Sequence, residues 1–148
     1  MANPDSLAQQ TAAVIGNYAV ASATAVPLGT TGNAVVALPF LTGGLTVGTS
    51  VANSGSVIVR RVTIQNPSGN LSTGNVSILT SNDGNASNAV VAAATLSSLT
   101  GTGTFQDMTI AGGNVVVSGI TTQALYVKVN TAVTGTVDIR VYGDTVSF

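Results

Sequence analysis

The stretch that decides the fold is Ser56-Val57-Ile58-Val59-Arg60-Arg61-Val62-Thr63-Ile64-Gln65, followed by Asn66-Pro67-Ser68-Gly69. Most of its residues are β-branched and favour strands, and Asn-Pro followed by Ser-Gly is typical of a turn. Apolar residues occupy both sets of alternating positions, with Val57 and Val59 in one set and Ile58, Val62 and Ile64 in the other. This pattern indicates either a strand covered by protein on both faces or one with a bulge at Arg60-Arg61. We expect it to be a central strand.

The composition bounds the class of protein. The chain has 148 residues, of which 45% are hydrophobic and only 6% are charged, and it contains no His, Cys, Trp or Glu. Ordinary domains are about 25% charged. Short uncharged residues (Thr, Ser, Asn and Gly) replace the missing charge, and the hydrophobic content is too high for a disordered chain. The length suits one domain with a real core.

The low charge also limits the partners. A net charge of -1 does not favour nucleic acid or an anionic membrane, since both attract basic surfaces. Gly, Asn, Ser, Thr and Pro interrupt every window of the roughly 20 residues that span a bilayer, so we expect no membrane partner. No secretory signal is evident in residues 1–6. A surface with so little charge is poorly protected against self-association, so we expect other subunits to cover much of it.

Short apolar stretches between turns predict about eight strands. Besides residues 56–65, the expected strands are 34–38, 75–80, 89–96, 105–110, 115–117, 124–129 and 137–142, and residues 45–47 are expected to form a brief extended piece. The last two alternate cleanly, and pairing them as a hairpin sets Val129 against Val137 and Lys128 against Asp138. The expected fold class is all-β, a jelly-roll-like β-sandwich, with an immunoglobulin-like sandwich second.

The weakly patterned N-terminal region is expected to be an extended arm (residues 1–33) preceding the β-sandwich domain (residues 34–148). Asp5-Ser6 caps a possible short helix over residues 7–13, whereas residues 14–20 also fit extended pieces. Two alternatives remain open for the arm: it docks on a neighbouring molecule, or it is a loosely attached tail.

Few side chains offer chemistry. With no His and no Cys, an enzyme would depend on carboxylates such as Asp107 or Asp138, so we expect no catalysis, no cofactor and no metal. Asn82-Asp83-Gly84-Asn85 has oxygen ligands, but it fits a plain turn better than a calcium loop. The six aromatic residues are scattered along the sequence, which does not favour a sugar-binding platform. The candidate residues for a protein interface are Tyr18, Phe40, Arg60 and Arg61.

Three segments carry a resemblance to known proteins. The segments Val57–Thr80, Phe105–Ile110 and Leu125–Gly143 resemble small β-rich virion proteins of tailed bacteriophages, and the closest role is that of a capsid cement, or decoration, protein. The resemblance covers about residues 56–143 and is a pattern of strands and turns without a motif of binding residues.

The resemblance implies a structural role. Proteins of this family sit on the outer capsid surface, usually as trimers, and bridge neighbouring capsomers. The implied partners are the major capsid protein and further copies of the chain, and the implied location is the virion after synthesis in the host cytoplasm. The alternative is a head-fibre or tail-associated carbohydrate-binding (lectin-like) module.

Overall fold

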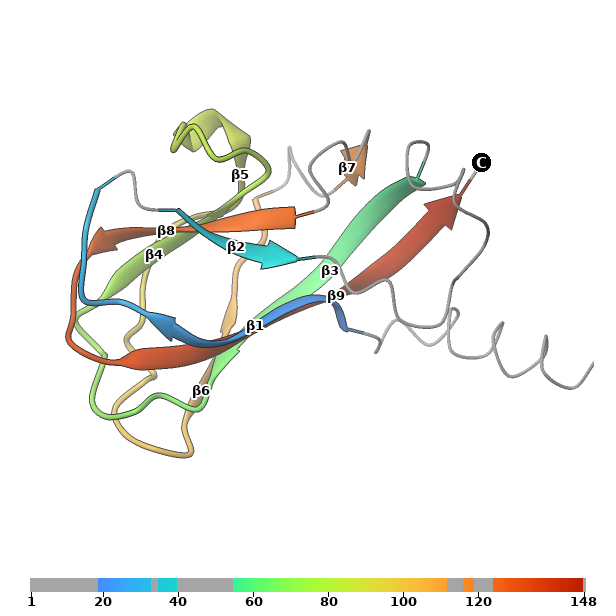
Figure 1. The fold of residues 1–148 in the computed structure, drawn as a ribbon. Coiled ribbons are helices and arrows are strands. Elements are labelled where there is room, and N and C mark those ends of the chain that lie inside the picture. Colours follow the sequence, from blue (N-terminus) through green and yellow to red (C-terminus); the bar gives the residue numbers. More distant parts are fainter. Residues whose placement is uncertain (1–18, 33–34, 40–54, 112–115, 119–123, 148) are drawn as a thin grey trace, which may run out of the picture.

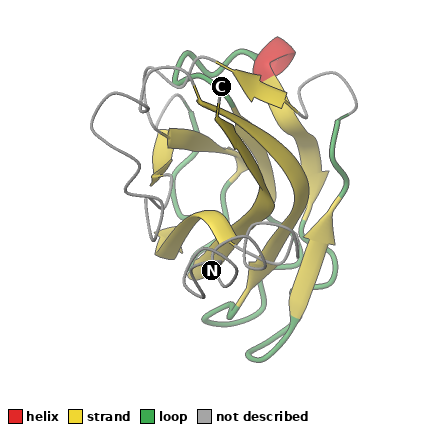
Figure 2. Ribbon diagram, turned by 90° about the vertical axis from the view of Figure 1, so that its right-hand side faces the viewer, coloured by secondary structure: helices red, strands yellow, loops and turns green. Residues whose placement is uncertain are grey.

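The computed structural model describes residues 19–32, 35–39, 55–111, 116–118 and 124–147, and these form an all-β structure. Figure 2 shows that strands and loops make up most of the described residues. The short helix drawn in it is the 3-10 helix η2 (Ala86–Asn88). The strands are β1 (Ala19–Pro27), β2 (Val35–Pro39), β3 (Gly55–Gln65), β4 (Asn75–Leu79), β5 (Ala89–Thr95), β6 (Phe105–Met108), β7 (Val116–Ser118), β8 (Ala124–Thr131) and β9 (Thr136–Ser147). Among these residues there is no helix that is both long and apolar enough to cross a membrane.

The strands form two antiparallel sheets. The first sheet has the order β1-β9-β3-β6, with β7 also paired to β3, and the second has the order β2-β8-β4-β5. Hydrogen bonds join the pairs β1·β9, β2·β8, β3·β6 and β4·β5, in which each pair lies within the sequence interval of the one before it. Figure 1 shows β3 and β9, the two longest strands, lying side by side with β1 along the other edge of β9. The prediction of an all-β fold is confirmed.

The central strand contains a bulge, which is one of the two alternatives that its sequence left open. β3 pairs with β9, β6 and β7, and its register against β9 shifts between Val59 and Arg61. The bulge changes which alternating positions face inward, so that Val57 and Val59 are buried before it and Val62 and Ile64 after it. The bulge therefore accounts for the buried residues in both sets of alternating positions, whereas Ile58, in the second set but before the bulge, is only partly buried.

One hydrophobic cluster joins the two sheets. It contains Val59, Val62 and Ile64 from the first sheet and Ile78 and Val127 from the second, all with side chains that are completely buried. Loop residues such as Leu71, Leu96 and Leu99 close its ends. The predicted strands at 34–38, 75–80, 89–96, 105–110 and 115–117 are found as β2, β4, β5, β6 and β7, whereas residues 45–47 lie outside the described residues.

The predicted hairpin of residues 124–129 and 137–142 is wrong. β8 belongs to the second sheet and β9 to the first, so the chain crosses between sheets at this turn. The inward parity was read correctly, since Val127, Val129, Val137 and Ile139 are all buried. Because both strands face the same core from opposite sheets, alternation alone cannot distinguish this arrangement from a hairpin.

The N-terminal region differs from the expected arm over residues 19–32. β1 pairs with β9, and Val20, Ala21, Val26 and Leu28 belong to the core. The backbone of Leu28 donates to the Gly135 carbonyl and accepts from the Val133 amide, which ties it to the loop between β8 and β9. Residues 1–18 lie outside the described residues.

Candidate functional site

Most of the charge in the chain lies on the outward side of the first sheet. Six of the nine charged residues project from β3, β6 and β9, alternating with buried apolar residues. We call these six residues the charged face: Arg60, Arg61, Asp107, Asp138, Arg140 and Asp144. Three arginines and three aspartates give this face no net charge, although it holds two thirds of the charged groups.

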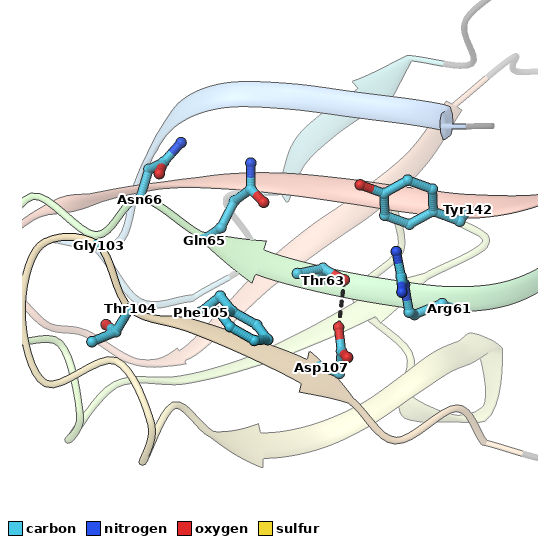
Figure 3. Close-up of a pocket in the computed structure, with 9 residues that line it drawn as sticks. All are labelled: Arg61, Thr63, Gln65, Asn66, Gly103, Thr104, Phe105, Asp107 and Tyr142. Carbon is cyan, nitrogen blue, oxygen red and sulfur yellow. Dashed lines mark hydrogen bonds between the residues drawn. The ribbon is translucent and has the colours of Figure 1, made fainter. Parts of the chain in front are cut away.

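A hollow of about 320 Å³ opens on this face, between β3 and the turn that leads into β6 (Figure 3). Its sides come from Arg61 and Gln65 on β3, Phe105 and Asp107 on β6, and Tyr142 on β9. The register explains this grouping, because Gln65 pairs with Phe105, Thr63 with Asp107 and Arg61 with Tyr142. Outward-pointing side chains from three neighbouring strands therefore lie beside one another in this hollow.

The middle of the hollow is held by a hydrogen bond between two strands. The hydroxyl of Thr63 donates to Oδ1 of Asp107 over 2.5 Å (Figure 3). Only 7% of Thr63 is exposed, whereas Asp107 is exposed. A hydrogen bond to an ionised acceptor is stronger than a neutral one, so it holds the carboxylate in one orientation.

Two arginines flank the bulge and have different partners. The guanidinium of Arg61 lies over the Tyr142 ring, 4.4 Å from its centroid, in a cation–π contact. Nε of Arg60 donates to Oδ2 of Asp144 at 2.9 Å. No hydrogen bond or ion pair joins the Arg61 guanidinium to another described residue, so its N–H groups remain open to a ligand.

Phe105 is the most exposed large hydrophobic residue among those described, with 62% of its surface accessible. It is the first residue of β6, and its ring lies at the side of the hollow (Figure 3). Burying a phenylalanine side chain stabilises a protein or complex by about 1.5–3 kcal/mol. The exposed ring is therefore a natural anchor for a ligand or partner.

Asp138 joins three segments at the end of the charged face. Its carboxylate accepts from the backbone N–H of Ala25 at 2.9 Å and from Nδ2 of Asn66 at 2.8 Å. These hydrogen bonds, the one from Asn66 first, lower the pKa of Asp138 below its usual value of 3.8, and nearby Arg140 acts in the same direction. Ala25 and Asn66 both have positive φ, at 53° and 52°, a conformation that non-glycine residues rarely adopt. The carboxylate bonds the backbone of the first and the side chain of the second. Its role is structural.

The outward side of the second sheet has little charge. We call it the charge-poor face, defined by Ala37, Asn75, Ser77, Ala93, Thr95, Tyr126, Lys128 and Asn130. Its one charged group is internally bonded, because Nζ of Lys128 donates to the Gly84 carbonyl at 2.8 Å. Asn130 likewise donates to Asn75 and Ser77. The predicted Lys128–Asp138 pair does not form, since the two residues are on different sheets.

The segment around Asp83 is a turn, as the sequence predicted. The carboxylate of Asp83 accepts from the Asn85 amide and from Nδ2 of Asn88. The backbone hydrogen bond from Asn85, the largest influence, and the side-chain bonds of Asn88 and Ser81 lower the pKa of this carboxyl group. Across the described part of the chain, no group of three or more acidic residues is placed to hold a metal ion.

The structure places only two of the four candidate interface residues. Tyr18 and Phe40 lie outside the described residues. Arg60 and Arg61 are both exposed on the charged face, because the bulge turns two adjacent residues to one side.

Sequence reasoning missed the hollow. The aromatic residues are scattered along the sequence, yet Phe105 and Tyr142 line the same hollow in the structure. The sequence does indicate that Phe105 and Asp107 lie on the same face of their strand, because they are two residues apart. Only the strand pairing shows that Arg61 and Tyr142 lie beside them.

The fold and this surface define an all-β protein with a hollowed, charged sheet face. Comparison with protein-family models, curated proteins and solved structures found no match for the chain.

Proposed function

We infer that the two sheets form a jelly-roll sandwich. The strand pairing supports this inference. The pairs β4·β5, β3·β6, β2·β8 and β1·β9 follow one another as they would in a single long antiparallel hairpin with β4·β5 at its tip. Wrapping such a hairpin around a core brings β9 beside β3 and β8 beside β4, and both contacts are present. The single core shared by the sheets fits this arrangement.

We propose that the protein is a structural virion component that binds the outside of a phage capsid and cements neighbouring capsomers. Jelly rolls occur in viral capsid and lectin domains, so the fold alone does not assign the role. The observation that carries the proposal is the segregation of charge between the two faces. It supplements the resemblance in strands and turns described above.

The charge-poor face is the surface that we propose to contact the capsid or a neighbouring copy. Removing charged groups from water is expensive, and the cores of protein interfaces are depleted in them. On this face the Lys128 ammonium and the Asn130 amide already have partners within the chain. Arg60 and Arg61, on the other sheet, then point away from the shell. Weak contacts that are repeated between many copies on a capsid lattice give a higher overall affinity through avidity.

The proposal includes a homotrimer and an arm limited to residues 1–18. The protein acts by binding, without catalysis, and each bound copy stabilises the assembled shell by mass action. Sedimentation of the purified protein should give a trimer. A variant lacking residues 1–18 should keep its β-sheet circular dichroism spectrum but no longer decorate capsids; normal decoration would show that the arm has no docking role.

The decisive experiment is cosedimentation with purified capsids of a charge-inserted variant. Ala93→Glu places a carboxylate on the charge-poor face, whereas Thr109→Glu makes the same change in charge at an exposed position next to β6. We expect Ala93→Glu to lose capsid binding and Thr109→Glu to keep it, with equal melting temperatures. Loss of binding in the Thr109 variant alone would place the contact on the charged face instead.

The hollow favours a second candidate function, a carbohydrate-binding module, because it combines an exposed aromatic ring with polar side chains.

A further inference from the structure

We propose that the hollow bounded by Arg61, Gln65, Phe105 and Asp107 binds a neutral oligosaccharide. This goes beyond the proposed attachment to a capsid, and it deepens the second candidate function, the carbohydrate-binding module, by naming the class of ligand. The charge-poor face would contact the shell, and the hollow on the other sheet would remain open to the surroundings of the particle.

The aromatic ring gives the first reason. A sugar ring has one face made largely of C–H groups, which packs against an aromatic face while the hydroxyl groups stay at its edge. Phe105 is 62% exposed and lies at the side of the hollow (Figure 3). The ring of Tyr142 already has Arg61 over it, which leaves Phe105 as the ring available for stacking.

The polar groups give the second reason. A guanidinium, an amide and a carboxylate are planar groups that engage two neighbouring hydroxyls at once. The side chains of Arg61 and Gln65 make no hydrogen bond to another described residue, and Asp107 uses only Oδ1, toward Thr63. These three groups therefore offer donors and acceptors to a ligand without first breaking contacts within the chain.

Preorganisation gives the third reason. The Tyr142 ring supports Arg61, and the Thr63 hydroxyl holds Asp107. Groups that are already oriented lose less side-chain entropy when a ligand binds, which matters for a weakly held, hydrated ligand. The backbone of β3 and β6 fixes the spacing between the two supported groups.

The chemistry of the hollow also selects against other ligands. Asp107 opposes an anion such as a phosphate ester, and Arg61 opposes a metal cation. The hollow is shallow and more polar than apolar, which does not suit a hydrophobic cofactor. Its volume of about 320 Å³ is at the small end of the range for small-molecule sites, roughly 300–1,000 Å³.

The test is a titration of the isolated, full-length protein with defined neutral oligosaccharides built from glucose, galactose, mannose and N-acetylglucosamine. An immobilised array would select the probe, and calorimetry would then measure its dissociation constant. We expect Phe105→Ala and Asp107→Asn each to weaken binding about tenfold, since each removes a contact with an affinity contribution of this order. Amide chemical shifts of Gln65 and Phe105 should move during the titration.

Val116→Ala is the matched control. Val116 is the other exposed large hydrophobic residue among those that the structure describes, at 56%. It lies on the same sheet, on β7, but does not line the hollow. This variant should bind like the unaltered protein. Equal loss in the Val116 variant, binding only of charged glycans, or no neutral ligand bound at millimolar concentration would overturn the proposal. Capsid cosedimentation of the Phe105 variant is measured separately from sugar binding. The capsid proposal and the oligosaccharide proposal can therefore be contradicted independently.

Discussion

At the scale of single residues, the Asp138 carboxylate connects parts of the chain that are distant in sequence. It accepts hydrogen bonds from Ala25 in β1 and from Asn66 after β3. A left-handed backbone conformation costs an L-residue roughly 1–2 kcal/mol, and both Ala25 and Asn66 adopt it. The hydrogen bonds to Asp138 help to offset this cost.

We expect Asp138→Ala to lower the free energy of unfolding by about 1–2 kcal/mol, because it removes two hydrogen bonds to a charged group that is partly accessible. Urea denaturation would measure the change. Asp144→Asn is the control: it lies on the same strand and loses only an exposed ion pair with Arg60, a change worth at most about 1 kcal/mol. An equal loss in both variants would contradict this role of Asp138.

The pH dependence of stability should also reflect Asp138. Its pKa in the folded state lies below 3.8, so its contribution is complete above that value and is lost as the pH falls through the lower folded-state pKa. Because the chain contains no His, we expect the urea midpoint to stay nearly constant from about pH 8 to about pH 5. It should fall below about pH 4, and less steeply in Asp138→Ala.

Gly143 is required by the bulge in β3. A Cβ atom at this position would lie 2.1 Å from the carbonyl oxygen of Ile58, which is backbone and cannot move aside easily. We expect Gly143→Ala to destabilise the protein by about 3 kcal/mol. The control is Gly69→Ala, where no heavy atom lies within 4 Å and the change should be within about 0.5 kcal/mol. Thermal unfolding of both variants would decide, and equal melting temperatures would contradict the steric argument.

At the scale of elements, β1 and the residue that follows it hold the N-terminal part of the fold in place. Leu28 is completely buried, and its backbone is bonded on both sides to the loop between β8 and β9. We expect Leu28→Ala to cost about 2–5 kcal/mol. The corresponding fall in melting temperature, roughly 2–4 °C per kcal/mol, would be measured by calorimetry. Thr30→Ala, at an exposed position, should leave the melting temperature almost unchanged.

The elements also show how far the sequence predicts this fold. Turn residues and β-branched stretches located the central strand, because these signals depend on neighbouring residues alone. They left its bulge open as one of two alternatives. They did not predict the partner of β8, since Val127 and Val129 face the same core whether β8 pairs with β9 or with β4. Similarly, no local pattern in residues 19–32 distinguishes an arm from an edge strand. The hollow depends on three strands and required the register.

At the scale of the whole molecule, the order of the strands makes most contacts distant in sequence. β1 pairs with β9, and β2 with β8, so each pairing closes a loop of most of the chain. Loop closure must precede the stabilising contacts, which makes such folds slow. We expect refolding from urea in milliseconds to seconds, followed by stopped-flow fluorescence of the tyrosines. Microsecond refolding would contradict the non-local topology.

The same strand order affects synthesis of the protein. β9 lies between β1 and β3, and β8 lies between β2 and β4, so the strands made last occupy interior places in both sheets. While a ribosome is still adding residues before 124, neither β1 nor β2 has its neighbour, and their edges stay open. A prematurely terminated copy that ends before β8 therefore leaves β1 and β2 without their hydrogen-bonding neighbours.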